Sequence, residues 1–138
     1  MKPVLLDTGV IVAWLDRSER FHQQATESVA ELRAPLITCE AVIAEACYLL
    51  RRLQGAAEAV LDNIAAGVFQ IPVPLSEPAR EVRRILRKYR DRHMDLADAC
   101  LIHLANEFRT GDILTLDHDF QIYRWGRNNP FHFLLPPP

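Results

Sequence analysis

Short apolar runs alternate along this chain with longer segments whose apolar residues recur at helical spacing. A brief apolar run that stops at a polar residue is typical of a buried strand, and it predicts strands at 3–6, 36–38, 68–73 and 113–116. The longer segments predict helices at 10–15, 21–32, 40–53, 56–66, 76–90 and 95–108, with Thr8 expected to cap the first. This alternation indicates an α/β fold, a three-layer α/β/α sandwich around a central, mostly parallel sheet. Residues 131–135 are a possible edge strand, so the sheet should have four or five strands.

Length and composition describe an ordinary globular chain. The 138 residues predict a single domain over 1–138, and hydrophobic residues make up 49%. We expect no secretion signal, because Asp7 interrupts the N-terminal apolar stretch, and no membrane contact, because no apolar run is long enough. The three cysteines show no paired spacing, which favours reduced thiols in a cytoplasmic protein over a disulfide framework or a zinc site. They are Cys39, Cys47 and Cys100.

Acidic residues occur where the predicted strands end or where the following helices begin. Asp7 directly follows the first strand and Asp117 directly follows the run at 113–116. In a parallel sheet such positions converge at one edge, where ligands bind. Crowded carboxylates repel one another unless a cation joins them, and oxygen-only ligands select Mg²⁺ or Mn²⁺. The helix predicted at 40–53 carries Glu40 and Glu45, and the helix predicted at 95–108 carries Asp95 and Asp98.

Some of these acids also have purely structural interpretations. Asp7 could serve only as a helix N-cap, and Asp117 and Asp119 could be turn residues. Asp95 with Asp98 resembles a capping box, so capping is the preferred interpretation for Asp95. Glu45 lies in the least polar part of its helix and has no such explanation. The four placements together favour a shared site over coincidence.

Other phosphate-binding and nucleophilic motifs are missing. The five glycines form neither GxGxxG nor a P-loop, and no GxSxG nucleophile elbow occurs. The segment Asp7-Thr8-Gly9 lacks the second aspartate of haloacid-dehalogenase-like phosphatases. A phosphoryl-receiver domain would need a lysine after its last core strand, but the only lysines are Lys2 and Lys88.

Four segments resemble the acidic motifs of PIN-domain proteins, in the same order and at similar intervals. They are LLDTG at 5–9, TCEAVIAE at 38–45, MDLADA at 94–99 and LTLDHDF at 114–120. The pattern is most similar to VapC-type toxins of prokaryotic toxin–antitoxin pairs. The resemblance implies an endoribonuclease that uses one or two Mg²⁺ or Mn²⁺ ions and water as the nucleophile. It also implies RNA products with 5′-phosphate and 3′-hydroxyl ends, a homodimer, and a possible antitoxin partner.

The resemblance also assigns roles by motif position. Asp7, Glu45, Asp98 and Asp117 would be the catalytic and metal-binding acids. Thr8 and Thr115 match supporting hydroxyl positions, and Asp95 and Asp119 match positions that are acidic only in some members. A catalytically inactive PIN-like module that binds nucleic acid or a partner is the alternative function, although all four core acids are present.

The segment 80–92 has seven basic residues and two acidic ones, in a chain that is otherwise acidic. On a helix, Val82, Ile85 and Leu86 would face the core and the cations would face outward. Such a stripe is typical of phosphate binding, but a solvated face or a dock for an acidic partner fits it as well. The RNA-binding candidates are Arg80, Arg83, Arg84, Arg87 and Lys88. Trp14 and Trp125 fit core or interface positions better than base-stacking ones.

Overall fold

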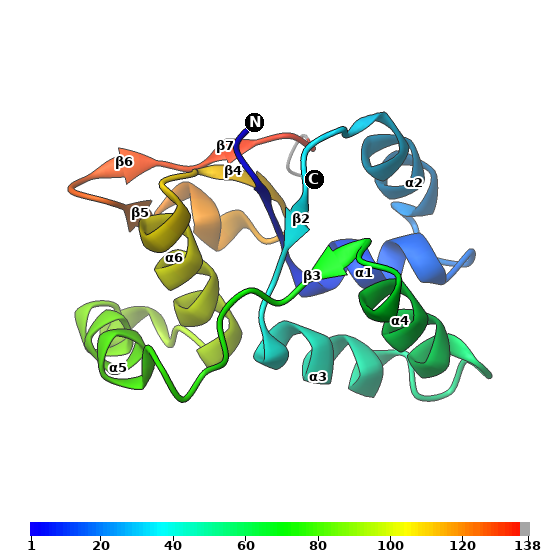
Figure 1. The fold of residues 1–138 in the computed structure, drawn as a ribbon, viewed down its shortest axis with the longest axis horizontal. Coiled ribbons are helices and arrows are strands. Elements are labelled where there is room, and N and C mark those ends of the chain that lie inside the picture. Colours follow the sequence, from blue (N-terminus) through cyan, green and yellow to red (C-terminus); the bar gives the residue numbers. More distant parts are fainter. Residues whose placement is uncertain (136–138) are drawn as a thin grey trace.

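A computed structural model describes residues 1–135 and places a five-stranded parallel sheet at the centre of the molecule (Figure 1). The strands are β1 (Val4–Leu6), β2 (Leu36–Ile37), β3 (Phe69–Gln70), β4 (Asp112–Leu114) and β7 (His132–Phe133). Their order is β3-β2-β1-β4-β7, and every neighbouring pair is parallel. The predicted α/β class, with a mostly parallel sheet of four or five strands, is therefore confirmed. The sheet has five strands, and the expected edge strand is reduced to two residues.

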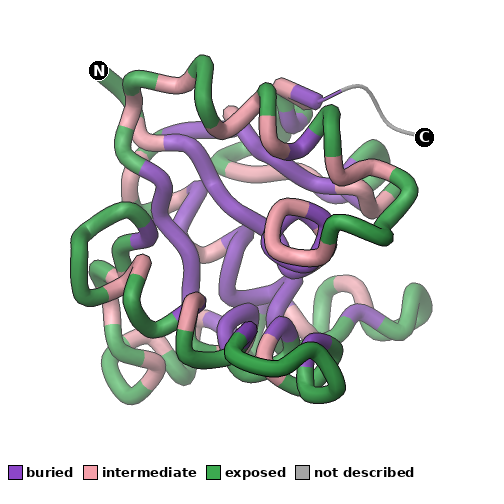
Figure 2. Tube along the Cα trace, turned by 90° about the vertical axis from the view of Figure 1, so that its right-hand side faces the viewer, coloured by how far each residue is buried: buried purple, intermediate pink, exposed green. Residues whose placement is uncertain are grey.

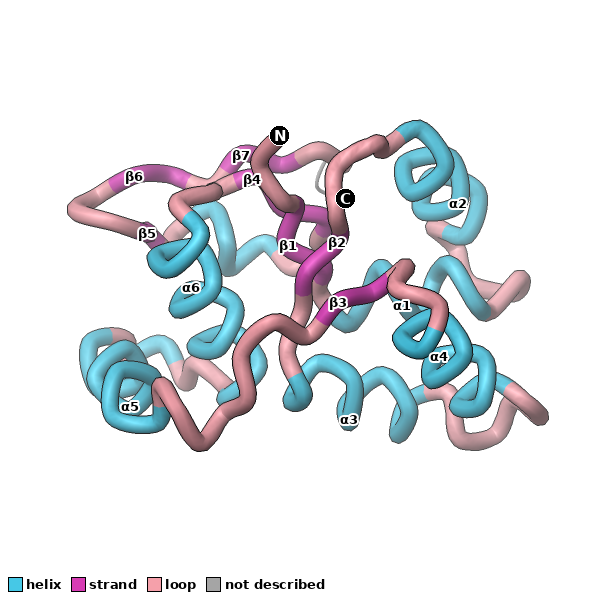
Figure 3. The backbone as a smooth tube through the Cα atoms, in the orientation of Figure 1, coloured by secondary structure: helices cyan, strands magenta, loops and turns pink. Residues whose placement is uncertain are grey.

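Six helices surround the sheet. They are α1 (Thr8–Leu15), α2 (His22–Glu31), α3 (Glu40–Leu49), α4 (Ala56–Ala65), α5 (Ala79–Lys88) and α6 (Leu96–Phe108). In Figure 1, α5 and α6 lie to one side of the sheet, and α1, α2 and α4 lie to the other. Figure 3 shows how loops carry the chain between these two groups of helices. Two short 3₁₀ helices follow α5 and β4, namely η1 (Arg90–Arg92) and η2 (His118–Gln121).

The three inner strands, β2, β1 and β4, are largely buried on both faces, which explains why their sequences are mostly apolar rather than alternating. Leu5, Ile113 and Leu114 have no exposed surface, and Leu6 is 1% exposed. Each such side chain contributes about 1.5–3 kcal/mol when it leaves water. In Figure 2 the buried segments, in purple, lie mostly in the interior, and exposed segments, in green, run mainly around the outside. This rigid centre holds the loops at the carboxyl ends of the strands.

The structure differs from the predictions at several element ends. The helix predicted at 40–53 stops at Leu49, and turns follow it, in which Arg51 N donates to the carbonyl of Tyr48. The helix predicted from residue 76 begins at Ala79 and ends at Lys88. Asp7, rather than Thr8, is the N-cap of α1, because its carboxylate accepts from Thr8 N and Thr8 is already helical.

A small antiparallel hairpin was not predicted. Its strands are β5 (Arg124–Trp125) and β6 (Asn129–Pro130), each too short to show an alternating pattern. The Trp125 indole lies so close to Gly111 that a β-carbon at position 111 would collide with it. Gly111 therefore serves as a contact surface for the hairpin.

Within residues 1–135, no helix combines the length and the apolar character needed to cross a membrane. The three cysteines are free thiols, as predicted, with Cys39 and Cys100 buried and Cys47 half-buried. The closing prolines, 136–138, lie outside the described residues.

Candidate metal centre

The sheet order brings Asp7 and the segment that leads to Asp117 to the switch point of the sheet. The chain adds β2 and β3 on one side of β1, and β4 and β7 on the other. Leu6 pairs with Leu114, so the residues that follow, Asp7 and Thr115, leave the sheet side by side. Crevices of this kind are where open α/β sheets bind ligands.

Asp7 is 6% exposed, and both of its carboxylate oxygens accept hydrogen bonds. Oδ1 accepts from Thr8 N at 2.8 Å, and Oδ2 accepts from Thr115 Oγ1 at 2.7 Å. Burial raises the pKa of this carboxyl from 3.8 to about 6, although both hydrogen bonds oppose the shift. Asp7 is thus an oriented carboxylate whose charge is poorly solvated.

Thr115 connects two acids. While its hydroxyl donates to Asp7, the same oxygen accepts from Asp117 N at 3.0 Å. The Thr115 side chain has no exposed surface, so this hydroxyl is fixed between the two residues. It therefore sets the spacing of Asp7 and Asp117.

Asp98 enters the same crevice from the first turn of α6 and is 6% exposed. Burial, and after it the charges of Asp95, Asp7 and Asp117, raise the pKa of its carboxyl to about 8. Its Oδ2 accepts a hydrogen bond of 3.2 Å from the hydroxyl of Tyr123. Sequence reasoning missed Tyr123, since a tyrosine in an apolar segment carries no signal of a partner so distant along the chain.

Asp117 completes a cluster of three carboxylates. One oxygen each from Asp7, Asp98 and Asp117 lies within 4.8 Å of the other two. Burial raises the pKa of Asp117, and its Oδ1 accepts from Asp119 N. Three predicted acids from distant parts of the sequence therefore converge.

The fourth predicted acid, Glu45, is exposed and is not a member of this cluster. It does line the same pocket, which has a volume of about 270 Å³ and also contacts Thr8, Asp95 and Asp98. Asp95 caps α6 by accepting from Asp98 N at 2.9 Å, as its capping-box pattern predicted. Asp119 is exposed and does not line the pocket.

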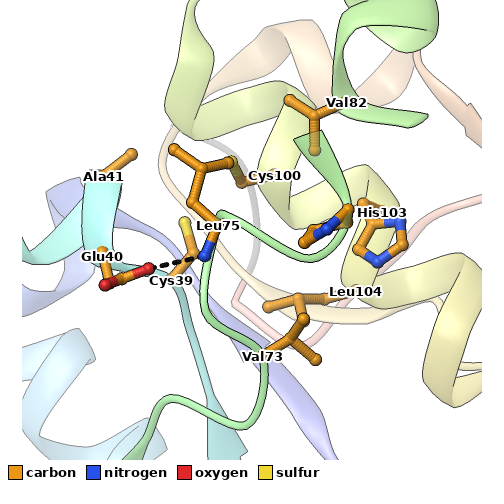
Figure 4. Close-up of a pocket in the computed structure, with 10 residues that line it drawn as sticks. Cys39, Glu40, Ala41, Val73, Leu75, Val82, Cys100, His103 and Leu104 are labelled. Atoms are coloured by element: carbon orange, nitrogen blue, oxygen red, sulfur yellow. Dashed lines mark hydrogen bonds between the residues drawn. The ribbon is translucent and has the colours of Figure 1, made fainter. Parts of the chain in front are cut away.

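Glu40, the other acid of α3, points away from the cluster. Its Oε1 accepts from Leu75 N at 2.8 Å, which ties the segment before α5 to the start of α3 (Figure 4). Figure 4 also shows Cys39 and Cys100 close to this contact, in a small pocket between α3, α5 and α6. Glu40 is therefore a structural contact.

The residues present suit a hard divalent cation. The donor set consists of carboxylate oxygens, without a histidine or a thiolate, which excludes the usual zinc ligands. Thr8 Oγ1 is buried at the same pocket and has no hydrogen-bond partner among the described residues. Burial, and to a smaller extent mutual repulsion, raises the pKa values of Asp7 and Asp98, and a bound cation would favour their charged forms.

The five basic candidates of α5 are all exposed, as predicted, while Val82 and Ile85 are buried. None of the five lines the acidic pocket. Arg84 pairs with Glu81 one turn earlier, at an exposed position where such pairs add little stability.

Comparisons with known proteins agree with this geometry. Residues 4–126 match the family model for the PIN domain. Over 116 residues the chain is 32% identical to ribonuclease VapC26 of Mycobacterium tuberculosis, covering 83% of this chain and 86% of that protein.

The fold is also similar to the crystal structure of VapC20 from Mycobacterium tuberculosis, a toxin that cleaves the sarcin-ricin loop. The TM-score is 0.80 at 19% identity, and the match covers 92% of this chain and 99% of VapC20. The family model spans most of the chain, and the curated relative is matched over most of both lengths, so this chain belongs to the PIN domain family.

Proposed function

We propose that this protein is a metal-dependent endoribonuclease that hydrolyses RNA phosphodiester bonds at the acidic pocket. The observation that carries the proposal is the cluster of Asp7, Asp98 and Asp117, whose oxygens lie within 4.8 Å of one another. A named ribonuclease at 32% identity supports the RNA substrate.

Asp7, Asp98 and Asp117 are the residues that would hold the cation. When bound, a divalent cation lowers the pKa of water and offsets charge on a phosphate. Thr115 and Tyr123 orient the carboxylates of Asp7 and Asp98 through hydrogen bonds. Fixed ligands need little rearrangement as charge develops on the phosphate oxygens.

Glu45 has a different part in this proposal. It is exposed at the rim of the pocket, on α3, and can approach a substrate without being a member of the three-acid cluster. A carboxylate there can accept a proton from the attacking water. Asp95 and Asp119 remain auxiliaries, the first through its cap on α6 and the second through its backbone contact with Asp117.

The cation we propose is Mg²⁺ or Mn²⁺, as one or two ions. Both accept all-oxygen ligand sets, and Mg²⁺ keeps several waters while it binds only a few carboxylates. Three close carboxylates with a fourth at the rim fit that preference.

The exposed cations of α5 would bind RNA phosphates. The helix presents Arg80, Arg83, Arg84, Arg87 and Lys88 outward while its apolar side packs on α6. In a cytoplasmic protein, which the three free thiols favour, such a stripe would meet RNA or an acidic partner.

Two partner proposals accompany the activity. A toxin role, with a separate antitoxin protein, follows from the likeness to VapC proteins. A homodimer would cover exposed large apolar side chains on α3, α4 and the loop between them. These are Tyr48, Leu49, Leu53 and Leu61. Sedimentation of the purified protein would test the dimer.

The decisive experiment is RNA cleavage by the purified protein with Mn²⁺, with Mg²⁺ and with a chelator. We expect cleavage with metal and none in chelator. The variants Asp7→Asn, Glu45→Gln, Asp98→Asn and Asp117→Asn should each lose activity by about a hundredfold or more, in line with the loss of a ligand or its support. Asp95→Asn and Asp119→Asn should lose less.

An inactive binding module would bind RNA equally with and without metal and would cleave nothing. Cleavage that survives in Asp98→Asn would also contradict the proposal. Growth arrest on induced expression of wild type, but not of Asp98→Asn, would support the toxin role.

A further inference from the structure

A pocket lies between α5, α6 and the β5–β6 hairpin, away from the acids. Arg84, Lys88 and Arg124 line it, and among residues 1–135 no acidic side chain does. Its volume is about 110 Å³, several times the roughly 10–15 Å³ that holds one water on the same measure. We call it the inner pocket.

The fixed polar groups of the inner pocket are donors. Asn106 Oδ1 accepts from Gly126 N at 2.6 Å, so the amide NH₂ is the part of Asn106 left for a ligand. Arg124 Nη1 donates to the three carbonyls of residues 121–123, which holds the guanidinium in place and leaves its other nitrogens free to donate. A concave surface with donors and cations only is suited to an anion.

A second pocket adjoins the first and shares Asn106 and Gly126 with it. We call it the outer pocket. Its charged residues are Lys2, Arg109 and Arg127, and no acidic residue of 1–135 lines it. The two pockets together form a continuous basic surface, which we call the hairpin groove.

Trp125 provides a flat aromatic surface in the outer pocket. Its Nε1 donates to the carbonyl of Pro130 at 3.1 Å, and its ring packs against Gly111. The indole is therefore held in one orientation while remaining partly exposed. An aromatic ring fixed beside cations is the arrangement on which single-stranded nucleic acids stack their bases.

The hairpin groove is linked to the metal centre through α6. Asp98, Ile102 and Asn106 are spaced four residues apart and so lie on one face of the helix. Eight residues of helix span about 12 Å. Arg124 directly follows Tyr123, whose hydroxyl contacts Asp98. The inner pocket thus lies roughly two turns of α6 from Asp98, within reach of an extended ligand that also occupies the acidic pocket.

We infer that the hairpin groove binds a single-stranded segment of RNA flanking the bond to be cut, with a phosphate in the inner pocket and a base stacked on Trp125. Every nucleotide joins a phosphate to a flat base and so matches both pockets, whereas an acidic peptide offers a ring only where an aromatic residue flanks its carboxylates. The inference rests on the proposed function and names a second contact for the same substrate.

The first test measures binding of a fluorescently labelled, unstructured single-stranded RNA in chelator, where cleavage cannot occur. The double variant Lys88→Glu with Arg127→Glu should bind at least about tenfold more weakly. For every phosphate that the variant no longer neutralises, the slope of log affinity against log salt should become shallower by about 0.7. The control is Arg17→Glu with Arg33→Glu, the same charge change at exposed positions near α2.

The second test addresses Trp125 and does not depend on net charge. Trp125→Leu should lose roughly fivefold to a hundredfold in RNA affinity, the range for one stacked base, and Trp125→Phe should recover part of it. RNA should quench tryptophan fluorescence in the wild type. That quenching should vanish in Trp125→Phe, because the remaining tryptophan, Trp14, packs edge-on against Phe69.

Binding and salt slope equal to those of the control would overturn the inference. It would also be overturned if both variants lost affinity for a glutamate-rich peptide but kept it for RNA, since the groove would then be a partner dock. The proposed function is judged separately, by cleavage in Mn²⁺. If the wild type cleaves RNA and the groove variants bind RNA normally, only the inference about the groove is contradicted. If the wild type binds RNA through the groove but never cleaves it, only the proposed function is contradicted.

Discussion

The hydroxyl of Tyr123 donates to Asp98 Oδ2 at 3.2 Å, which joins the segment before the hairpin to the metal centre. The Tyr123 ring has no exposed surface and packs edge-on against Tyr89 and Phe120. Burial and the charge of Asp98 raise the pKa of Tyr123 above its usual range, so the phenol remains protonated and can only donate to the carboxylate. Tyr123 therefore positions Asp98.

The first prediction concerns Tyr123→Phe, which removes the hydroxyl and keeps the ring. Metal affinity should fall about tenfold or more, as for other groups that orient a ligand. Isothermal titration with Mn²⁺ would measure it. Tyr89→Phe is the matched control, because it loses a half-buried hydroxyl bonded to Arg124 N instead of to an acid. An unchanged Mn²⁺ affinity in Tyr123→Phe would show that the contact is only structural.

The second prediction concerns the hydroxyl between Asp7 and Asp117. Thr115→Val has nearly the same shape but leaves Asp7 Oδ2 and Asp117 N without their partner. We expect about a tenfold to hundredfold loss of metal affinity and of cleavage rate. Thr110→Val is the control, since Thr110 is equally buried and its hydroxyl bonds to Pro3 O, away from the acids. Equal effects in both variants would assign Thr115 to stability alone.

The sequence contained enough to predict the metal centre in outline. Asp7 and Asp117 directly follow continuously apolar runs, and a parallel sheet must bring such positions to one edge. The start of α6 carried its own capping pattern, which located Asp98 within one turn. These are local signals, and the structure confirms that the three carboxylates meet.

Features that depend on long-range contacts could not be predicted in the same way. Glu45 lies in an apolar stretch, yet α3 turns it outward together with Tyr48 and Leu49. Apolar periodicity does not distinguish a face packed in the core from an apolar face left exposed. The hairpin was missed because it depends on contacts of Trp125 with Gly111 and Pro130 rather than on strand propensity. The single-domain assignment for 1–138 stays a prediction.

The third prediction tests the outer face of α5 separately from the hairpin groove. Arg83→Glu with Arg87→Glu changes two exposed side chains that do not line either groove pocket. RNA binding should weaken for all sequences alike and become less dependent on salt. Fluorescence anisotropy over a salt series measures both. If affinity and slope equal those of Arg17→Glu with Arg33→Glu, the face is solvated or serves another partner.

The last prediction uses pH to separate a metal pocket from a helix cap. Without metal, burial raises the pKa of Asp7 from 3.8 to about 6, and burial with the neighbouring acids raises that of Asp98 from 3.8 to about 8. Between about pH 4 and pH 8 the folded state therefore binds more protons than the unfolded state, so stability falls as pH rises. The stabilisation is complete below about pH 4 and is lost as pH rises through 6 and then 8.

Asp98→Asn removes one of these charges. Its effect on stability without metal should have the opposite sign to that of a mutation that only removes a helix cap. Without metal at pH 8.5 the variant should unfold at a higher temperature than wild type, and its stability should change less between pH 6 and 8.5. If Asp98 served only the helix dipole, the variant would instead lose about 0.3–1 kcal/mol. Wild type should gain about 2.7 kcal/mol at a hundred times the dissociation constant for Mn²⁺, and the variant much less. Thermal unfolding in chelator at pH 6 and pH 8.5, and with Mn²⁺ at pH 7.5, distinguishes a metal-binding role of Asp98 from a helix-capping role. A variant that is less stable than wild type in chelator, yet gains as much from Mn²⁺, would remove Asp98 from the metal centre.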